Sequence, residues 1–563
     1  MTRTTGGAAL VAALRQEGVR HVFGLIGTSL LEVLDVIHED PDISYVGVRH
    51  EQNAVHMADA YARVTGRPGV VLACQPGPGA TNLVTGLAQA RLAYSPVVAV
   101  AGLPASGHLD TDVFQEIDQQ ALFGPVSKQV RTVHVAGRLP EYVHEAFRIS
   151  LSGRNGPVVL NVPSDVLAAD ANSAGPAREA AAPAALPAPS ASSAARAADL
   201  LNAAGRPLII AGGGVAWARA GGALMELADR LNAPIVASAG HPDVVPNDYR
   251  LYAGQIGPRG NAVATGLARS ADVILALGTR LGFNSTFYSH DNISATARII
   301  QADVDPSAVG RYFPVEVGIT ADAGELIGAL LPAVKQAAAR EAWIGPFLAD
   351  RQALLADRAS TAAAIEGALT PLAVCLAAQR ALPRETIVTL DTGTCCMQST
   401  DVIQTFGGPG SFLAPLDFGL VGFAYPAGLG AKAAAPDRPV LTIVGDGGFG
   451  MSMGEIGTAI GAGLSTITLV MDNGAWGAEK AYQRDFYGGR YVGADLVNPA
   501  FDQVAAAFGA VGVRARTADD VTAAVAQALR DDAPTIVHVP VNPDQIISLR
   551  RDVFAHRSAG QAG

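Results

Sequence analysis

Short apolar runs rich in β-branched residues alternate with helical segments along almost the whole chain, and this alternation limits the possible folds. The clearest runs are ISYVGV, GVVLAC and PVVAVAG in the first part, PLIIAGGG, PIVASAG, ADVILALG and ARIIQADV in the middle, and TIVTL, RPVLTIVGDGG and STITLVMDN in the last. Strands that are apolar throughout and separated by helices are typical of parallel sheets covered on both faces. The sequence therefore predicts an α/β chain with three doubly wound parallel-sheet domains. No repeat of about 20 to 50 residues is present, which excludes solenoids and propellers.

Changes in composition mark the borders between these domains. Residues 173–196 combine many Pro, Ala and Ser residues with a loss of apolar periodicity, and are predicted to be a linker. A charged helical stretch over residues 336–368 is predicted to be a second connection. The predicted domains are residues 1–172, 197–335 and 369–563.

Charge and cysteine content exclude several classes of function. The chain has 40 basic and 51 acidic residues, a net charge of −11, which argues against nucleic acid or an anionic membrane as the main partner. No apolar run approaches the roughly 18 residues that cross a bilayer, and the N-terminal segment has the spacing of an amphipathic helix rather than a signal peptide. Four cysteines cannot form a disulfide framework in a chain of 563 residues. A reducing cytoplasm therefore fits best, with Cys395 and Cys396 as packed thiols.

The first candidate site follows the strand VLTIV. Asp446 ends this strand and precedes Gly447 and Gly448, and Asn473 follows the next strand, TITLVM. One βαβ unit brings Asp446 and Asn473 to the ends of neighbouring strands, where parallel sheets bind ligands, and the glycines let backbone N–H groups approach an anion. A carboxylate, an amide oxygen and the backbone carbonyl of Ala475 make half of an octahedral oxygen shell. This predicts Mg²⁺ with diphosphate oxygens and water as the other ligands.

The second candidate is Glu51, which follows the strand ISYVGV and begins a helix. Alone, a carboxylate there could simply favour the helix N-terminus. However, VFGLIG precedes it and GPGATN follows the next strand, where Pro78, Gly79 and Asn82 can pack against and hydrogen-bond to a flat heterocycle.

Four motifs together resemble those of the thiamine-diphosphate enzymes of the acetohydroxyacid-synthase and pyruvate-oxidase type. They are GDG with its downstream Asn, Glu51 in HEQNA, VFG-x-x-G ending at Gly27, and GPGATNLVTGL. The resemblance runs nearly from end to end. It implies the thiamine-diphosphate-binding fold: an N-terminal pyrimidine-binding domain, a central domain related to nucleotide-binding domains, and a C-terminal domain that binds diphosphate and Mg²⁺. It also implies a homodimer or homotetramer with active sites shared between subunits.

The same resemblance implies roles for individual residues. Glu51 would hydrogen-bond the aminopyrimidine ring and so promote loss of the thiazolium C2 proton. In PLDFGLVGFAYPAG, the backbone groups of Gly419 and Val421 match those that bind the pyrimidine. Val421 also matches the bulky residue that bends the cofactor, although Val is smaller than the Met or Leu usual there. Gln115 and Glu116, in FQE, would lie in the pocket, as substrate-binding or proton-relay residues.

Residues 476–492 resemble one branch of this family. Their pattern, WGAEK-x-x-Q-x-DFY-x-x-RYV, is similar to that of the sulfoacetaldehyde acetyltransferases, although such a segment could also be a solvated charged face. The resemblance implies conversion of sulfoacetaldehyde and phosphate to acetyl phosphate and sulfite, which requires binding of two anions. The side chains expected to meet these substrates are Lys128, His241, Arg280, Glu479, Lys480 and Arg490.

Two other functions stay open. Acetolactate synthase and related 2-oxo acid carboligases share GPGATNLVTGL and FQE, and acetolactate synthase usually keeps FAD in its central domain. Here Gly212, Gly213 and Gly214 form only a weak nucleotide fingerprint, more typical of a tight turn, so we expect no FAD and a colourless protein. A thiamine-fold binding protein without catalysis is the alternative from another class. The presence of Glu51 and Asp446 argues against it.

Overall fold

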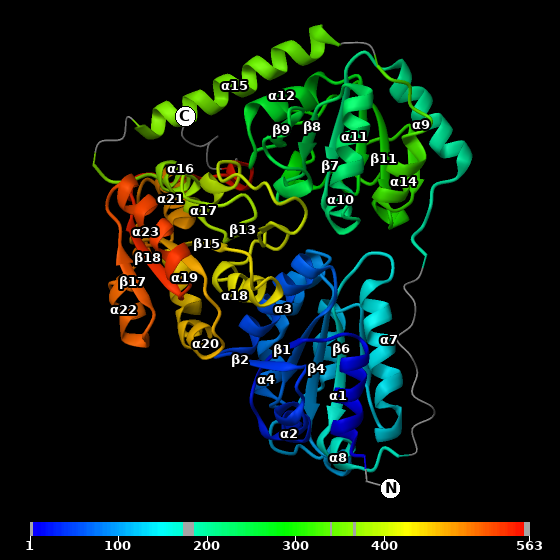
Figure 1. Cartoon of the computed structure of the whole chain (residues 1–563), viewed down its shortest axis with the longest axis vertical. Helices are drawn as coiled ribbons and strands as arrows, with labels where there is room; N and C mark the ends of the chain where they lie inside the picture. The colour runs from blue at the N-terminus through cyan, green and yellow to red at the C-terminus, as the bar shows by residue number, and fades with distance from the viewer. Residues whose placement is uncertain (1–3, 173–184, 338–339, 364–366, 555, 557–563) are drawn as a thin grey trace. The chain divides into compact units, whose positions relative to one another are not determined.

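Three six-stranded sheets, parallel throughout, form the framework of the computed structural model, which describes residues 4–172, 185–337, 340–363, 367–554 and 556 (Figure 1). The sheets run from β1 (His21–Leu25) to β6 (Val158–Pro163), from β7 (Pro207–Ala211) to β12 (Val317–Thr320), and from β13 (Ile387–Leu390) to β18 (Thr535–Pro540). They confirm the predicted α/β class with three parallel-sheet domains. Each sheet lies inside one of the three predicted domain ranges, whose limits stay predictions.

The first sheet has the strand order β2-β1-β3-β4-β6-β5. Its inner and edge strands include β2 (Ser44–Gly47), β3 (Gly69–Ala73), β4 (Val97–Leu103) and β5 (Gln129–Thr132). The helices of this part are α1 (Gly6–Gln16), α2 (Leu31–Glu39), α3 (Glu51–Thr65), α4 (Pro78–Asn82), α5 (Val84–Leu92), α6 (Gln119–Phe123), α7 (Leu139–Leu151) and α8 (Ser164–Ala168). The strand order changes direction between β1 and β3, so the loops after these strands flank the crevice where such sheets bind ligands.

The third sheet repeats this topology in the order β14-β13-β15-β16-β18-β17. Its further strands are β14 (Phe412–Leu413), β15 (Val440–Gly445), β16 (Ile467–Asp472) and β17 (Val511–Arg514). Its helices are α16 (Pro371–Gln379), α17 (Thr394–Ser399), α18 (Ala424–Ala434), α19 (Asp446–Ser452), α20 (Ile456–Gly461), α21 (Gly477–Phe486), α22 (Phe501–Phe508) and α23 (Ala518–Asp531). The change of direction falls between β13 and β15, which places Asp391 and Asp446 at the crevice.

The central sheet has the order β12-β11-β10-β7-β8-β9, which is the strand order of dinucleotide-binding domains. Its further strands are β8 (Ile235–Ala237), β9 (Tyr252–Gln255), β10 (Val273–Leu277) and β11 (Arg298–Asp303). Its helices are α9 (Ala191–Ala203), α10 (Gly213–Trp217), α11 (Gly221–Leu231), α12 (Ala262–Ser270), α13 (Phe283–Thr286), α14 (Ala323–Leu330) and α15 (Glu341–Ala363). The sequence predicted that this domain is related to nucleotide-binding domains, and its strand order agrees with that prediction.

The two predicted connections differ in how much structure they contain. Helix α9 begins inside the predicted linker, because the Ser190 hydroxyl caps it by accepting from Ser193 N at 3.1 Å and alanines follow. Residues 173–184 of that linker lie outside the described residues. The second connection contains α15, whose Trp343 and Phe347 are buried in the central core.

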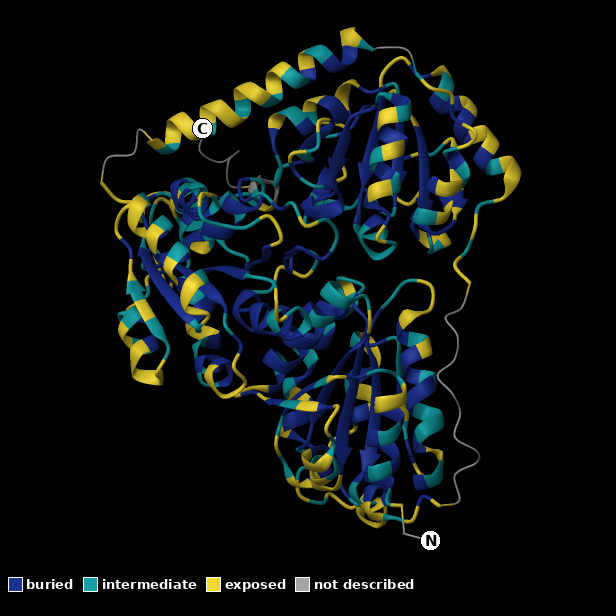
Figure 2. Ribbon diagram, viewed as in Figure 1, coloured by how far each residue is buried: buried dark blue, intermediate teal, exposed yellow. Residues whose placement is uncertain are grey.

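The strands of the three sheets are mostly buried (dark blue), whereas the outer faces of the helices are exposed (yellow) (Figure 2). The four cysteines are buried free thiols, which agrees with packed rather than paired sulfurs. Within the part of the chain that the structure describes, no helix is long and apolar enough to span a membrane.

The chain passes back and forth between two compact units. One unit comprises Met1–Ala185, Pro426–Asp437 and Ser452–Leu464, and the other comprises the rest. In the first unit the buried Glu455 carboxylate accepts hydrogen bonds from Arg49 N at 3.0 Å, Asn53 Nδ2 at 2.8 Å and Thr458 Oγ1 at 2.6 Å. These bonds attach a late segment of the chain to the turn between β2 and α3.

Candidate functional site

Glu51 is the first residue of α3, and only 3% of it is exposed. Asn82, at the end of α4, donates from Nδ2 to Glu51 Oε2 at 2.9 Å. Gly79 lies against the other oxygen, because a Cβ at Gly79 would be 3.1 Å from Oε1. A buried carboxylate needs such a partner. The structure therefore brings together Glu51, Gly79 and Asn82, three residues singled out from the sequence, and gives Asn82 the task of orienting Glu51.

Gln75, which sequence reasoning missed, connects two further predicted residues of the first sheet. It donates from Nε2 to Gln115 Oε1 at 2.6 Å, and its own Oε1 accepts from Thr28 N at 3.1 Å. A Cβ on Gly27 would lie 2.8 Å from the backbone carbon of Cys74 and 2.9 Å from Gln75 N, so this turn requires glycine. Gln75 follows the strand GVVLAC by one residue, and that position was a signal that could have identified it.

The loop that carries Gln115 is strained. Asp110, Asp112 and Gln115 have φ values of 64°, 56° and 65°, in the left-handed region that L-residues rarely adopt. The Glu116 carboxylate folds this loop by accepting from Asp110 N at 2.6 Å and Val113 N at 3.1 Å. Glu116 thus shapes the loop, while the side chain of Gln115 reaches Gln75.

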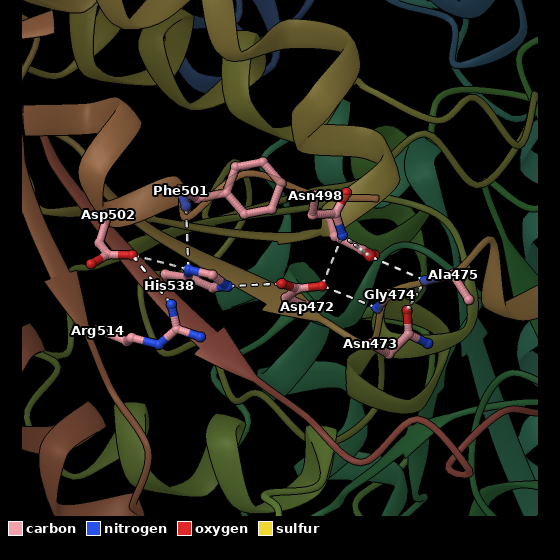
Figure 3. Close-up of polar contacts among 10 residues, drawn as sticks. Asp472, Asn473, Gly474, Ala475, Asn498, Phe501, Asp502, Arg514 and His538 are labelled. Carbon is pink, nitrogen blue, oxygen red and sulfur yellow. Dashed lines mark hydrogen bonds and ion pairs between the residues drawn. The ribbon is translucent and has the colours of Figure 1, made fainter. Parts of the chain in front are cut away.

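Asp446 and Asn473 follow the neighbouring strands β15 and β16, which pair in parallel up to Gly445 and Met471. Figure 3 shows Asn473 with Asp472 and Ala475. Ala475 N lies 3.2 Å from Asp446 Oδ2 and 3.3 Å from Asn473 Oδ1. Asn473 Nδ2 is buried without a hydrogen-bond partner. This set of hard oxygen donors suits Mg²⁺. Among the described residues no cluster of three His, Cys, Asp or Glu could hold a metal ion.

Asp472 brings a second carboxylate to this edge of the sheet. Burial and the charge of Asp472 raise the pKa of Asp446. Burial alone would raise the pKa of Asp472 too, but hydrogen bonds from His538 and Asn498 outweigh it and hold that pKa below its usual value. A divalent cation bound here would favour the ionised form of both carboxyl groups.

The two glycines after Asp446 lie close to neighbouring side chains. A Cβ on Gly447 would lie 2.5 Å from the Trp476 ring. A Cβ on Gly448 would lie 3.1 Å from Asp391 Oδ2 and 3.3 Å from Val421 Cγ1. The turn that follows β15 is thereby kept close to Val421, the predicted wedge residue.

Asp391 holds the loop that contains Gly419 and Val421. Its buried carboxylate accepts from Thr392 N at 2.7 Å, Gly422 N at 3.1 Å and Ala424 N at 3.2 Å, and burial raises its pKa to about 7. Sequence reasoning missed Asp391, although it directly follows TIVTL as Asp446 follows VLTIVG. The loop therefore has a fixed base at the end of β13.

Lys128 precedes β5, and its ammonium group lies at the C-terminal end of helix α7. Its ammonium group donates to the carbonyls of Ile149, Ser152 and Arg154 at 2.6, 2.7 and 2.9 Å. Burial and the nearby Arg91 lower its pKa to about 8. These three bonds use all three donors of the ammonium group, so an anion would have to displace a carbonyl to bind there.

The two substrate candidates of the central domain lie after its strands. Arg280 forms an ion pair with Asp417 at 2.9 Å, close in sequence to Gly419. The ring of His241 packs on Gly213, where a Cβ would be 3.0 Å from it. Arg280 thus contacts the segment that leads into the predicted pyrimidine-binding loop.

The candidates after Asn473 lie on and after α21. Lys480 forms an ion pair with Asp495 at 2.6 Å and lies over the Tyr491 ring at 5.2 Å. Glu479 and Arg490 are exposed. Lys480, Arg490 and Tyr491 thus belong to the same compact unit as Asp446.

Buried carboxylates and tightly packed glycines thus follow strands of the first and third sheets. Family models agree over most of the sequence. They match residues 4–122 as "Thiamine pyrophosphate enzyme, N-terminal TPP binding domain", residues 194–330 as the central domain, and residues 391–539 as the C-terminal TPP binding domain.

Relatives of full length are similar to the chain. Sulfoacetaldehyde acetyltransferase of Castellaniella defragrans is 33% identical, covering 98% of this chain and 95% of that protein. The same enzyme of Alcaligenes xylosoxydans xylosoxydans is 34% identical, covering 94% and 90%. The acetolactate synthase large subunit of Corynebacterium glutamicum is 33% identical, covering 96% and 87%. The chain therefore belongs to the thiamine pyrophosphate enzyme family.

Proposed function

We propose that this chain is a thiamine-diphosphate-dependent acyltransferase that converts sulfoacetaldehyde and phosphate to acetyl phosphate and sulfite. The observation that carries the proposal is the segment from Trp476 to Val492, which begins at the predicted metal donors and contains Lys480 and Arg490. Similarity to two sulfoacetaldehyde acetyltransferases supports it. Both substrates are anionic, which suits Lys480 and Arg490, two of the three basic residues of this segment.

Residues of the chain would divide the binding of the cofactor among them. Asp446, Asn473 and the Ala475 carbonyl would hold Mg²⁺ and, through it, the diphosphate. When bound, thiamine diphosphate supplies the nucleophilic carbon that adds to the substrate carbonyl. Glu51, oriented by Asn82, would exchange a hydrogen bond and a proton with the pyrimidine ring.

The substrate-binding residues would lie around this centre. Lys480 and Arg490 are the favoured partners of sulfonate or phosphate, since Arg490 is exposed and Lys480 pairs with Asp495, which is itself exposed. Gln115 would contact the substrate from the strained loop. Lys128 is a weaker candidate, because three carbonyls already occupy its ammonium group.

Acetolactate synthesis from pyruvate is the second candidate function. The synthase of C. glutamicum is 33% identical over 96% of the chain, the same identity as the acetyltransferase of Castellaniella defragrans, so overall identity favours the two functions equally. A non-catalytic thiamine-binding protein is the third alternative, disfavoured because Glu51, Asp446 and Asn473 are all present.

Product analysis separates these functions. The purified protein with Mg²⁺ and thiamine diphosphate is incubated with sulfoacetaldehyde and phosphate, and separately with pyruvate. We expect sulfite and acetyl phosphate in equal amounts from the first mixture, with no acetyl phosphate when phosphate is omitted. Carbon dioxide and acetolactate from pyruvate alone would instead identify a synthase. Cofactor binding without turnover of either substrate would support the non-catalytic alternative.

Flavin content gives a further prediction. Cβ atoms on Gly212 and Gly214 would clash with the backbone of Gly278, at 2.6 and 2.5 Å, so loop packing alone accounts for these glycines. We therefore expect the purified protein to be colourless, with no absorbance near the flavin band and no FAD released on denaturation. A yellow preparation with stoichiometric FAD would contradict this and favour the synthase.

We also propose a cytoplasmic homodimer or homotetramer, as the family resemblance implies. Four buried thiols are consistent with a reducing compartment. Sedimentation of the loaded protein measures the assembly directly.

A further inference from the structure

The amide of Asn498 connects the carboxylates of Asp446 and Asp472 at the carboxyl end of the third sheet. Figure 3 shows Asn498 beside Asp472. The Asn498 Nδ2 lies 2.7 Å from Asp446 Oδ2 and 2.9 Å from Asp472 Oδ1. An amide NH₂ group has two hydrogens, and here each one is donated to a carboxylate in a charge-assisted hydrogen bond. Asn498 therefore fixes the orientation of both carboxyl groups.

Backbone pairing holds Asn498 in this place. Trp476 N donates to Ala494 O at 2.7 Å, and Leu496 N donates to Gly474 O at 2.8 Å, so an antiparallel bridge precedes Asn498. The turn on the other side of this bridge carries the predicted ligands that follow β16. Backbone hydrogen bonds therefore hold the segment that leads to Asn498 against the turn that follows β16.

Asp472 is fixed from its other side by His538, on β18. His538 Nε2 lies 2.8 Å from Asp472 Oδ2, while Nδ1 lies 3.2 Å from Phe501 N and 3.1 Å from Asp502 Oδ1. Arg514 is 3.8 Å from Asp502. The imidazole is only 2% exposed, so the ring is a rigid support. The fixed Asp472 carboxylate accepts one hydrogen bond from the Asn498 amide, and this holds the amide in place to donate its second hydrogen bond to Asp446.

We propose that Asn498 is a positioning residue that keeps the Asp446 carboxylate in the orientation in which it binds the divalent cation together with Asn473 and Ala475. The proposal rests on the proposed function, because it requires a bound cation. Outer partners of metal ligands typically contribute about 10- to 100-fold to metal affinity. We expect a contribution of that size from Asn498.

Calorimetric titration with Mg²⁺ at saturating thiamine diphosphate tests the proposal. Asn498→Leu keeps the approximate shape but removes both donors, and should weaken Mg²⁺ binding by about 10- to 100-fold. At saturating Mg²⁺, kcat should return close to that of the unmodified protein. Asn202→Leu is the matched control, because this half-buried amide also uses both ends, with Lys335 N at 2.8 Å and Ala333 O at 3.4 Å. It lies in the central domain and should leave Mg²⁺ affinity unchanged.

The outcomes are distinct. Unchanged Mg²⁺ affinity in Asn498→Leu overturns the positioning role, as does an equal loss of affinity in Asn202→Leu. A lower kcat at saturating Mg²⁺ with unchanged affinity also overturns it. If the unmodified protein binds neither Mg²⁺ nor thiamine diphosphate, the proposed function fails instead. Thermal unfolding without Mg²⁺ checks folding, and Asn498→Ser, which keeps one donor and is smaller, replaces the leucine variant if that variant does not fold.

Discussion

Replacement of Glu51 by Gln should lower turnover by about 10²- to 10⁴-fold, the usual contribution of a positioned acid–base group. Gln has nearly the same shape as Glu and can still accept from Asn82 Nδ2, which lies 2.9 Å from Glu51 Oε2. It cannot exchange a proton with the cofactor ring. We therefore expect thiamine diphosphate to bind within a few-fold of its original affinity while steady-state turnover of sulfoacetaldehyde falls.

Glu32 offers a matched control for this experiment. It also lies in the first turn of a helix, α2, but its side chain is exposed. Glu32→Gln should leave both turnover and cofactor affinity unchanged. Full turnover in Glu51→Gln would show that the carboxylate of Glu51 has no part in activation.

Asp446→Ala should abolish the stabilisation that Mg²⁺ and thiamine diphosphate give the protein. A ligand at 100 times its dissociation constant stabilises the folded state by about 2.7 kcal/mol, which for domains of this size raises the unfolding midpoint by roughly 5 to 10 °C. Without the Asp446 carboxylate the metal loses its charged protein donor, so the diphosphate loses its attachment. Thermal unfolding of both proteins, with and without the two ligands, measures the effect.

Asp485→Ala provides the comparison for this second variant. Asp485 is a half-buried carboxylate of the same compact unit, bound to Arg484 and to Ser548 rather than to the metal edge. We expect its midpoint still to rise on addition of the ligands. An undiminished rise in Asp446→Ala would remove Asp446 from the predicted metal site.

The sequence predicted the parts of the site that follow strands. Asp446 and Asn473 could be located because each lies one residue beyond a continuous apolar run, and parallel strands end at one edge. Glu51 needed the additional GPGATN motif, because a carboxylate at a helix start has an ordinary explanation. Strands such as β5 and β17 were missed because they are short sheet edges with half-exposed residues.

The supporting residues could not be predicted in the same way. Asn498 lies in a segment without apolar periodicity, and its contacts depend on a backbone bridge between distant turns. His538 was visible as a polar residue inside the strand TIVHVP, but nothing in the sequence names Asp472 as its partner. The sequence alone could not show whether Lys128 binds an anion or the protein itself. Its ammonium group binds carbonyls at the end of a helix, and these contacts are visible only in the structure.

The interleaved path of the chain limits how this protein can be divided into fragments. A fragment ending near residue 170 would contain the whole first sheet but would lack Pro426–Asp437 and Ser452–Leu464 of its compact unit. Asn53 and the Arg49 amide would then lose the Glu455 carboxylate that they bind. A fragment beginning near residue 369 would carry that carboxylate, buried in the intact chain, without these two donors. Recombinant expression for crystallisation or labelling therefore needs the uncut polypeptide, even though the three sheets occupy separate stretches of sequence.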